Sequence, residues 1–524
     1  MRRILTTAVA IAVMGGAALS APAIAADGQR SIDPRTADLT PSGDASAVPP
    51  QAALPEVADI AGSDALTTAR RVLSGKARAN DPSVTLALRD LWAKKSELSG
   101  RDLSAAEAIL ARPTDGAGDD QGFGYTTAEA APVCNTRICL HYVPTTADAP
   151  PSPDWVNQNL TAVDSIWTQE VDQLGYRAPL SDGSKGGGPQ LDVYLKDLGG
   201  QGIYGYCAPE TRVKNRTASG YCVLDNDFSQ AQFPNAAPSD NLTVTAGHEF
   251  FHAIQFGYDY NEDRWMMEST ATWMEERVAT AVNDNRQYFE TSPIYAPYVP
   301  LDLFSSQYTF QYGSWVWWEY LSSKYGNKIV KKTWDEAGSL KKDGGKNSIA
   351  ALEKVLKKKG GLTKTFAKFS AGNLTPAANF PEGAEYPYPR FTNGKALKKG
   401  KSKRFNAKIY HLASASYGFA PKGTKGKKWK LAVSVNGPVK RTSPAAVVIV
   451  HLKNGKRQVK LVKLNNNGDG SIRVSFDSKK VGLVSVTLVN GSTRYQCNRG
   501  TGYACQGKPL DDKARFSVMG RVTK

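Results

Sequence analysis

The chain has 524 residues, of which 41% are hydrophobic and 22% charged. This balance is typical of a globular protein with a packed core, and the length excludes a single ordinary domain and predicts two to four. The net charge of +17 is unevenly distributed. Residues 391–524 contain 29 Lys and Arg against four Asp, a net charge of +25, while the remainder carries −8. Outside a cell, such a basic segment favours anionic polymers or membrane surfaces over nucleic acid. Alternatively, the lysines only keep a β-domain soluble and protect its edges.

The first 25 residues have the pattern of a secretory signal peptide. Met1-Arg2-Arg3 is a basic start, the run from Ile4 to Leu19 is mostly apolar, and Ala23-Ile24-Ala25 fits a small-residue cleavage site. The run is too short for a membrane span, and no later stretch approaches 18 uninterrupted apolar residues. We therefore expect a secreted protein, extracellular or associated with a cell surface, without a transmembrane segment.

The six cysteines agree with export because they fall as close pairs. The pairs are Cys134/Cys139, Cys207/Cys222 and Cys497/Cys505. An even count in an exported chain predicts disulfides, and pairing between nearest neighbours is the simplest connectivity. A metal held by cysteines would need a tighter C-x-x-C spacing, which is absent here.

Residues 26–125 are predicted to be a linker followed by a helical pro-region. The first part, to about residue 65, is rich in Ala, Pro, Ser and Asp, and amphipathic stretches follow near Asp64–Ser74 and Ser83–Arg112. A flexible acidic break, Pro113–Asp120, comes after them. The alternative is an ordinary helical N-terminal domain. Because the segment has no cysteine, inhibition by a pro-region would have to be steric.

Residues 126–390 show a mixed pattern of strands and helices. Strands are expected at Ile138–Val143, Gln190–Leu195 and Tyr221–Leu224, a helix at Asp154–Gly175, and mainly helices from Asn241 to Asn373.

Residues 391–524 alternate as short strands separated by turn signals such as Asn454-Gly455, which predicts a basic β-sandwich domain. The expected strands are Lys430–Val435, Ala445–Leu452, Gln458–Leu464, Ile472–Phe476, Leu483–Val489 and Arg515–Val522.

The most informative segment contains His248-Glu249-Phe250-Phe251-His252. We expect a helix here, capped by Ser239 or Asp240 and ended by Gly257. Two histidines four residues apart share one helix face, so both imidazoles can hold one cation. Glu249 is rotated by roughly 100° and can reach a water on the metal without binding the metal itself. The competing interpretation is a helix whose histidines pack without metal.

A catalytic zinc ion needs a third protein ligand. The metzincin pattern would require Gly at position 255 and His at position 258, but the chain has Gln255 and Tyr258. The better candidate is Glu268, which we expect one turn into a second helix that packs back on the first. Glu275 or Glu276 is a weaker alternative.

These residues resemble the gluzincin metallopeptidases, such as thermolysin and the aminopeptidase-N family. The segments HEFFHAIQFGYD and WMMESTATWMEE are also similar to segments of a group of secreted bacterial proteins that are predicted to be metalloproteases. The specific match covers about 40 residues, and the broader layout covers 130–390. The resemblance implies an α+β fold with a zincin-like catalytic domain at 126–390. It also implies Zn²⁺ bound by His248, His252 and Glu268, with Glu249 as catalytic base.

Two features depart from that family. The spacing from histidine to glutamate is shorter than in thermolysin, and Thr272 stands where the family has an Asp that orients a ligand. We expect Glu275 to supply that carboxylate. A tyrosine that stabilises the oxyanion is expected at Tyr312, with Tyr308 as a rival, although Tyr312 could equally be a core aromatic.

Further expectations concern substrate and calcium. The strand Tyr221–Leu224 is a candidate edge strand on which a peptide substrate would pair. A group of loop residues could bind Ca²⁺, although solvated loop acids without an EF-hand spacing are the simpler interpretation. This group comprises Asp225, Asp227, Asp259, Asn261, Glu262 and Asp263.

The sequence therefore predicts a secreted zinc metalloendopeptidase with peptide or protein substrates, in which Glu249 activates a water. The alternative is a protein that binds an anionic cell-surface polymer through its basic domain and has a catalytically inactive or weak peptidase-like domain. A zinc hydrolase of other amides is a third option.

Overall fold

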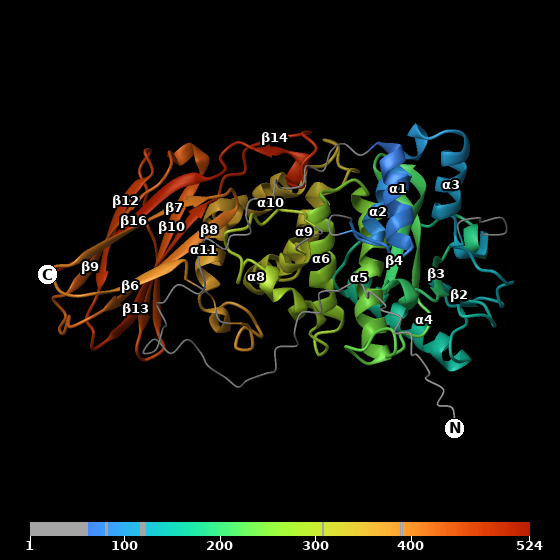
Figure 1. The fold of residues 1–524 in the computed structure, drawn as a ribbon, viewed down its shortest axis with the longest axis horizontal. Coiled ribbons are helices and arrows are strands. Elements are labelled where there is room, and N and C mark those ends of the chain that lie inside the picture. Colours follow the sequence, from blue (N-terminus) through green and yellow to red (C-terminus); the bar gives the residue numbers. More distant parts are fainter. Residues whose placement is uncertain (1–60, 79–81, 116–121, 306–308, 388, 390) are drawn as a thin grey trace, which may run out of the picture. The chain divides into compact units, whose positions relative to one another are not determined.

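The computed structural model describes residues 61–524 except 79–81, 116–121, 306–308, 388 and 390. The predicted signal peptide and nearly all of the expected linker lie outside the described residues. The described part is a mixed α+β structure in which helices and several sheets follow one another along the chain (Figure 1). The expected α+β class is confirmed at this level.

A five-stranded sheet with the order β1-β2-β3-β5-β4 forms the first half of the fold. β2, β3 and β5 run parallel, while β1 and β4 run antiparallel to their neighbours at the two edges. The strands are β1 (Val133–Cys134), β2 (Ile138–His141), β3 (Leu191–Lys196), β4 (Gly205–Lys214) and β5 (Thr217–Asp225).

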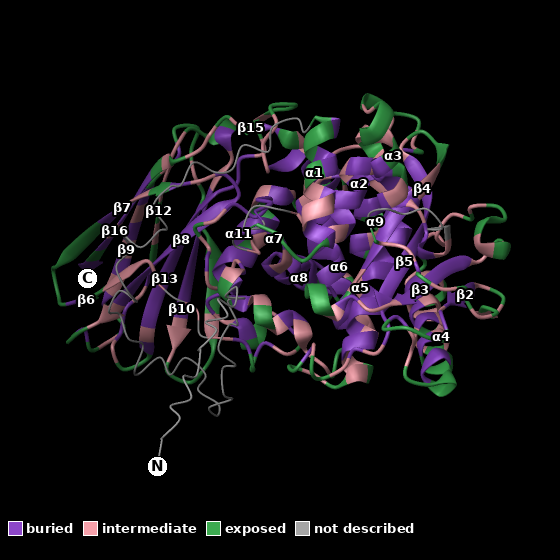
Figure 2. Cartoon of the chain, turned by 45° about the vertical axis from the view of Figure 1, so that its right-hand side comes forward, coloured by how far each residue is buried: buried purple, intermediate pink, exposed green. Residues whose placement is uncertain are grey.

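Helices cover both faces of this sheet, which explains why its inner strands β2, β3 and β5 are buried along almost their whole length (Figure 2). Val193 and Leu195 belong to the large hydrophobic cluster that includes α4 (Pro153–Trp167) and α5 (Pro238–Asp259). Tyr194 and Val223 belong to a separate cluster formed with the N-terminal helices. Neighbouring strand residues point to opposite faces, so the two clusters lie on opposite sides of the sheet.

The N-terminal helices are α1 (Gly62–Leu73), α2 (Val84–Lys94) and α3 (Gly100–Leu110). The single amphipathic stretch expected over Ser83–Arg112 is therefore two helices, separated by a short 3₁₀ turn at Lys95–Glu97. Their apolar residues pack against the sheet tyrosines rather than only against one another. This segment thus shares a core with the sheet.

A mainly helical region follows α5, as expected. It comprises α6 (Arg264–Val278), α7 (Phe310–Gly313), α8 (Trp315–Tyr325), α9 (Lys328–Ala337), α10 (Ser348–Leu356) and α11 (Leu362–Gly372). Tryptophans 265, 273, 315, 317, 318 and 334 are fully buried here. They make this region the most densely aromatic part of the core.

The C-terminal segment is a sandwich of two sheets with the orders β11-β10-β13-β8-β6 and β12-β9-β16-β7 around a core of their own. The expected strands correspond to β9 (Lys430–Asn436), β10 (Pro444–Leu452), β11 (Arg457–Leu461), β12 (Asp469–Ser475), β13 (Val481–Asn490) and β16 (Ala514–Thr523).

Three strands of the sandwich were not expected: β6 (Asn393–Leu397), β7 (Ser402–Ile409) and β8 (Ala413–Pro421). β6 has only one buried residue, and β7 has exposed Lys403, Arg404 and Lys408 among its few apolar residues, so neither shows a clear alternation in the sequence. β8 is Ala- and Ser-rich and buried along nearly its whole length, so it does not alternate. A short ladder of β14 (Tyr495–Gln496) and β15 (Lys508–Pro509) completes the strands.

The three expected disulfides are all formed, between Cys134 and Cys139, Cys207 and Cys222, and Cys497 and Cys505. They fit an extracellular protein, because such bonds persist in oxidising compartments. Within the described ranges, none of the helices combines the length and hydrophobicity that a bilayer span requires.

Candidate metal centre

Helix α5 carries the two histidines and spans Pro238–Asp259. The expected caps are wrong. Ala237 is the N-cap, a proline occupies the first turn, and the helix continues through Gly257 to Asp259. Proline is favoured there because its missing N–H would be unpaired in any case. Gly257 remains helical because the surrounding core holds both flanks of the helix.

Helix α6 packs closely against α5, and Gly247 makes this possible. A Cβ atom at position 247 would lie 2.4 Å from Cγ2 of Val278 on α6. A side chain at this position would require Val278 to move. The glycine next to His248 therefore fixes how near the second helix approaches the first.

This approach brings Glu268 against both histidines, as the sequence predicted. Oε2 of Glu268 lies 3.3 Å from Nε2 of His248 and 3.7 Å from Nε2 of His252. The ligand atoms of His248, Glu249 and His252 all lie within 4.8 Å of one another. Glu268 and His252 are buried, and Glu249 is nearly so.

The two distances from Glu268 are close to those between the ligands of a small tetrahedral cation. Zinc bonds of about 2.0–2.1 Å at tetrahedral angles separate neighbouring ligand atoms by about 3.3–3.4 Å. His252 Nε2 and Glu268 Oε2 are also buried without a hydrogen-bond partner among the described residues. Unpaired polar atoms cost free energy in an apolar interior unless a ligand binds them. The donor set and its geometry therefore fit a zinc ion.

The outer nitrogen of each imidazole is held by an acceptor. His248 Nδ1 lies 2.6 Å from Oε1 of Glu275, and His252 Nδ1 lies 2.7 Å from Oε1 of Gln255. An acceptor at Nδ1 places the ring proton there and leaves the Nε2 lone pair free for a metal. The expected role of Glu275 agrees with this contact.

The contact of Gln255 with His252 was not predicted from the sequence, although Gln255 lies three residues after His252 on the same helix. Its Nε2 donates to the carbonyl of Met267 and to the hydroxyl of Thr270 on α6. These bonds settle the orientation of the amide, so that its oxygen faces His252. The available signal was the polar residue at i+3 from a candidate ligand on an otherwise apolar helix.

The histidines and carboxylates of the centre change one another's pKa values. Burial alone would lower the pKa of His248, but Glu268 and Glu275 raise it well above its usual value. Burial opposes ionisation of Glu268, yet the two imidazoles hold the pKa of its carboxyl below the usual range. Burial raises the pKa of Glu275 to about 7. The site thus attracts positive charge at the point where the three atoms meet.

Glu275 and Glu276, the alternative ligands, face away from that point. Glu275 binds the outer nitrogen of His248, and Glu276 accepts a hydrogen bond from Asn285 at 2.8 Å. The remaining histidines of the chain, His141, His411 and His451, are paired with other residues elsewhere.

Tyr312 lies beside the centre, on the short helix α7. Its ring centroid is 6.2 Å from that of His248 and 5.0 Å from that of Tyr288, on which it stacks. Burial, followed by the charges of Glu268 and Tyr288, raises the pKa of Tyr312 well above its usual value. Its hydroxyl therefore keeps its proton and can donate a hydrogen bond. The rival Tyr308 lies outside the described residues.

The edge strand next to the centre is β4, and the prediction of Tyr221–Leu224 for this role is wrong. Those residues lie in β5, between β3 and β4. The reason is that Gly205–Lys214, which precedes them, forms the long strand β4 and pairs with the outer side of β5. The outer edge of β4 faces α2.

The loop acids considered for calcium have protein partners. Both carboxylate oxygens of Asp225 accept backbone N–H groups, including those of Leu198 and Phe228. Asp259 binds the guanidinium of Arg216, with a shortest distance of 2.7 Å. Within the described residues, the one group of neighbouring metal-ligating side chains is that of His248, Glu249 and His252.

A family of unknown function (DUF6055) matches residues 209–346, a segment that contains α5 and α6. No curated protein matches the chain. One similar solved structure is the pre-peptidase C-terminal domain of collagenase from Bacillus anthracis, with 9% identity, a TM-score of 0.15, and coverage of 25% of this chain and 95% of that one.

Another similar structure is a family GH115 4-O-methyl-α-glucuronidase with specificity for decorated arabinogalactans. Its identity is 9%, its TM-score is 0.13, and the match covers 67% of this chain and 54% of that one. TM-scores of this size carry no argument about the fold or function of this chain.

Proposed function

We propose that this protein is a secreted zinc metallopeptidase that hydrolyses peptide bonds. One observation carries the proposal: Oε2 of Glu268 lies 3.3 Å from Nε2 of His248 and 3.7 Å from Nε2 of His252, and this oxygen and the His252 nitrogen are buried without a hydrogen-bond partner in the part of the chain described. The Nδ1 atoms of His248 and His252 each face an acceptor, which favours the ring tautomer that a metal needs. A zinc ion bound there would lower the pKa of a water towards 7 and polarise a substrate carbonyl.

The roles of the surrounding residues follow from their positions. The carboxylate of Glu249 lies within 4.8 Å of the ligand atoms of both histidines, so it can serve as general base to a water held there and then return the proton to the leaving amine. Tyr312 keeps its hydroxyl proton and donates to the oxygen on which charge develops. Glu275 and Gln255 hold the two imidazoles in place.

The test uses zinc content and peptide hydrolysis of the full-length protein. We expect one zinc per chain in the wild type and in Glu249→Gln, with hydrolysis of casein lost only in the variant. Glu290→Gln is the control, because Glu290 is an exposed residue of the 3₁₀ helix Asp284–Thr291. Absence of bound zinc in the wild type contradicts the proposal. So does a Glu249→Gln protein that remains as active as the wild type.

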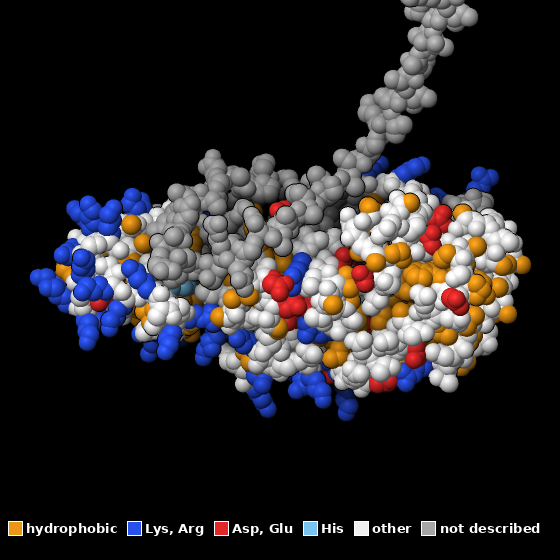
Figure 3. All heavy atoms as spheres, turned by 90° about the horizontal axis from the view of Figure 1, so that it is seen from below, with side chains coloured by type: hydrophobic (Ala, Val, Ile, Leu, Met, Phe, Trp, Pro, Cys, Tyr) orange, Lys and Arg blue, Asp and Glu red, His pale blue; other side chains and the backbone are white. Residues whose placement is uncertain are grey.

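A second function, binding of an anionic polymer, is favoured by a groove on the sandwich. The groove has a volume of about 370 Å³ and lies where the chain passes from β6 to β7. Five lysines line it, Lys395, Lys398, Lys401, Lys403 and Lys422, and its lining includes no Asp or Glu. Lys and Arg side chains also crowd the surface of this domain in Figure 3.

Lys395 and Lys403 lie on β6 and β7, and Lys398, Lys401 and Lys422 lie at the ends of β6, β7 and β8. All five are exposed, and in the described structure none of them forms an ion pair with the protein. An array of unpaired cations along a groove fits a linear polymer of phosphate or uronate groups. We propose that it attaches the protein to such a polymer.

Binding to dextran sulfate beads by the full-length protein tests this second function. We expect the triple variant Lys398→Gln/Lys401→Gln/Lys422→Gln to elute at lower salt than the wild type. It makes fewer ionic contacts with the beads, so a lower salt concentration is enough to screen them. The control is Lys328→Gln/Lys358→Gln/Lys368→Gln, which removes the same charge from exposed helical positions. Equal elution of both variants would show that only net charge matters, and would contradict a role for the groove.

A further inference from the structure

Helix α2 covers the outer edge of β4. Thr85 Oγ1 accepts a hydrogen bond from the N–H of Cys207 at 3.0 Å, and Trp92 Nε1 donates to the carbonyl of Glu210 at 3.1 Å. Both backbone groups belong to the edge strand and point away from β5. A peptide that binds by strand addition would need such groups. In the full chain they are already bound by side chains of α2.

The first turn of the same helix reaches the candidate centre. Ser83, its N-cap, donates to Oε1 of Glu268 at 2.6 Å, and Thr85 donates to Oε2 of Glu249 at 2.8 Å. A general base must lie about 2.6–3.2 Å from the proton it accepts. Thr85 occupies that range on Glu249 and is itself 1% exposed. A buried threonine hydroxyl therefore stands where a water or substrate must be.

Contacts on the other flank hold α2 between the sheet and the α5–α6 turn. Arg89 donates to the carbonyl of Glu262 at 3.1 Å, and Asp90 pairs with Arg264 at 2.7 Å. Trp92 also packs edge-on against Tyr260, with a centroid distance of 4.8 Å. The helix is thus fixed on both sides of the proposed active site.

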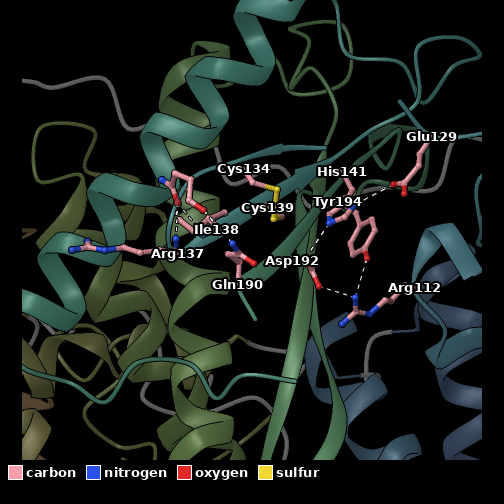
Figure 4. The surroundings of a disulfide bond; sticks show 11 residues. Arg112, Glu129, Cys134, Arg137, Ile138, Cys139, His141, Gln190, Asp192 and Tyr194 are labelled. Atoms are coloured by element: carbon pink, nitrogen blue, oxygen red, sulfur yellow. Dashed lines mark hydrogen bonds and ion pairs between the residues drawn. A yellow bond between two sulfur atoms is a disulfide. The ribbon is translucent and has the colours of Figure 1, made fainter. Parts of the chain in front are cut away.

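The end of the N-terminal segment is anchored by a buried ion pair. The guanidinium of Arg112 donates to Asp192 at 2.7 Å and to Glu210 at 2.8 Å, and also pairs with Asp182. Figure 4 shows Arg112 directed at Asp192 and Tyr194 of β3. Breaking such a pair would leave uncompensated charges in a buried place. The segment therefore does not detach by simple fraying.

From these contacts we infer that α2 obstructs the proposed active site, so that the full chain hydrolyses substrate slowly and only when α2 opens. Activation requires residues 83–94 to leave the space between β4 and α6. The closure uses the hydroxyls of Ser83 and Thr85 rather than a thiol, since residues 26–125 contain no cysteine. This inference rests on the proposed function, because it concerns access to the same carboxylates.

The test compares Thr85→Val with wild type in the full chain, each loaded with zinc. Valine keeps the shape of threonine but removes both hydrogen bonds of the hydroxyl. We expect peptide hydrolysis to rise about tenfold, since a hydrogen bond to a charged group contributes roughly that factor to the closed state. Thr67→Val is the control, because Thr67 is an exposed residue of α1. An unchanged or lower rate for Thr85→Val overturns the inference.

A second measurement, amide hydrogen exchange, needs neither metal nor turnover. We expect the amide of Cys207 to exchange about tenfold faster in Thr85→Val, while those of Tyr206 and Ala208, which point to β5, are unchanged. Trp92→Phe removes the other edge contact and should raise hydrolysis in the same direction. Absence of bound zinc from the wild type and from every variant would reject the proposed function but would not bear on the closure by α2. An unaltered exchange rate at Cys207 would reject the closure by α2.

Discussion

Oε1 of Glu275 lies 2.6 Å from Nδ1 of His248, on the side of the ring opposite the proposed metal position. The two residues are 27 positions apart and come from the facing helices α5 and α6. The carboxylate fixes both the tautomer and the rotation of the imidazole.

Replacing Glu275 by Ala should weaken zinc binding by about 10–100-fold, the usual effect of losing a partner that orients a ligand. Glu275→Gln should have a smaller effect, because its amide oxygen can still accept from Nδ1. Competition with a chromophoric chelator measures both affinities. Equal affinities of wild type and Glu275→Ala would show that the contact does not prepare a metal ligand.

Gly247→Ala should separate α5 from α6. The new Cβ would meet Val278 at 2.4 Å, and overpacking of this kind typically costs about 1–3 kcal/mol of unfolding free energy. We expect a lower urea midpoint together with weaker zinc binding, because Glu268 is carried by the displaced helix. The pair Gly247→Ala/Val278→Ala should recover much of both losses. Failure of that double variant to recover would contradict the proposed steric cause.

Glu170 should destabilise the fold at neutral pH. It is fully buried in the short π-helical turn after α4, and its carboxylate oxygens have no hydrogen-bond partner among residues the structure describes. Burial raises its pKa well above the usual value of 4.5. The folded state thus retains a proton that the unfolded state releases, so stability falls as pH rises above 4.5.

Glu170→Gln removes this titration while keeping the shape of the side chain. The variant should be more stable than wild type at neutral pH, and the difference should shrink towards pH 4.5. Urea unfolding at several pH values measures it, with Glu290→Gln as control. A constant difference across pH would exclude Glu170 as the titrating group.

His411 should make the fold sensitive to alkaline pH. It lies between Asp302 and Asp512, with nitrogen–oxygen distances of 2.9 and 2.6 Å. Burial opposes its charge, but Asp302 and Asp512 raise its pKa to about 9. The stabilising contribution is complete below the ordinary value of 6.5 and is lost as pH rises through about 9.

Thermal unfolding between pH 6 and 10 tests this dependence. His411→Asn should be less stable than wild type at pH 6, and the two melting temperatures should approach each other above pH 9. Parallel curves would contradict a charged His411.

Local patterns predicted much of the fold and of the candidate centre. The spacing of His248 and His252 follows from helix periodicity alone, and the cysteine pairs follow from proximity in the sequence. Glu268 could be identified because a short polar turn forces α6 to pack back on α5. Glu275 could be predicted as the carboxylate that orients a histidine because it lies on the same helical face as Glu268.

Contacts between distant segments could not be predicted in this way. The hydrogen bonds of Thr85 with Glu249 and Cys207 join residues more than a hundred positions apart, and the periodicity of a sequence contains no information on such contacts. The edge position of β4 depends on strand order, which the sequence of β5 does not contain. Likewise, the helix ends near Ser239 and Gly257 were set by packing in the core rather than by the local cap residues.

Anomalous diffraction at the zinc absorption edge tests the central claim most directly, using crystals of the full-length protein prepared with zinc. The account predicts one strong peak about 2.0–2.2 Å from Nε2 of His248, Nε2 of His252 and Oε2 of Glu268. Absence of a peak at these three atoms in a folded protein would contradict it. So would a zinc ion bound only by other residues.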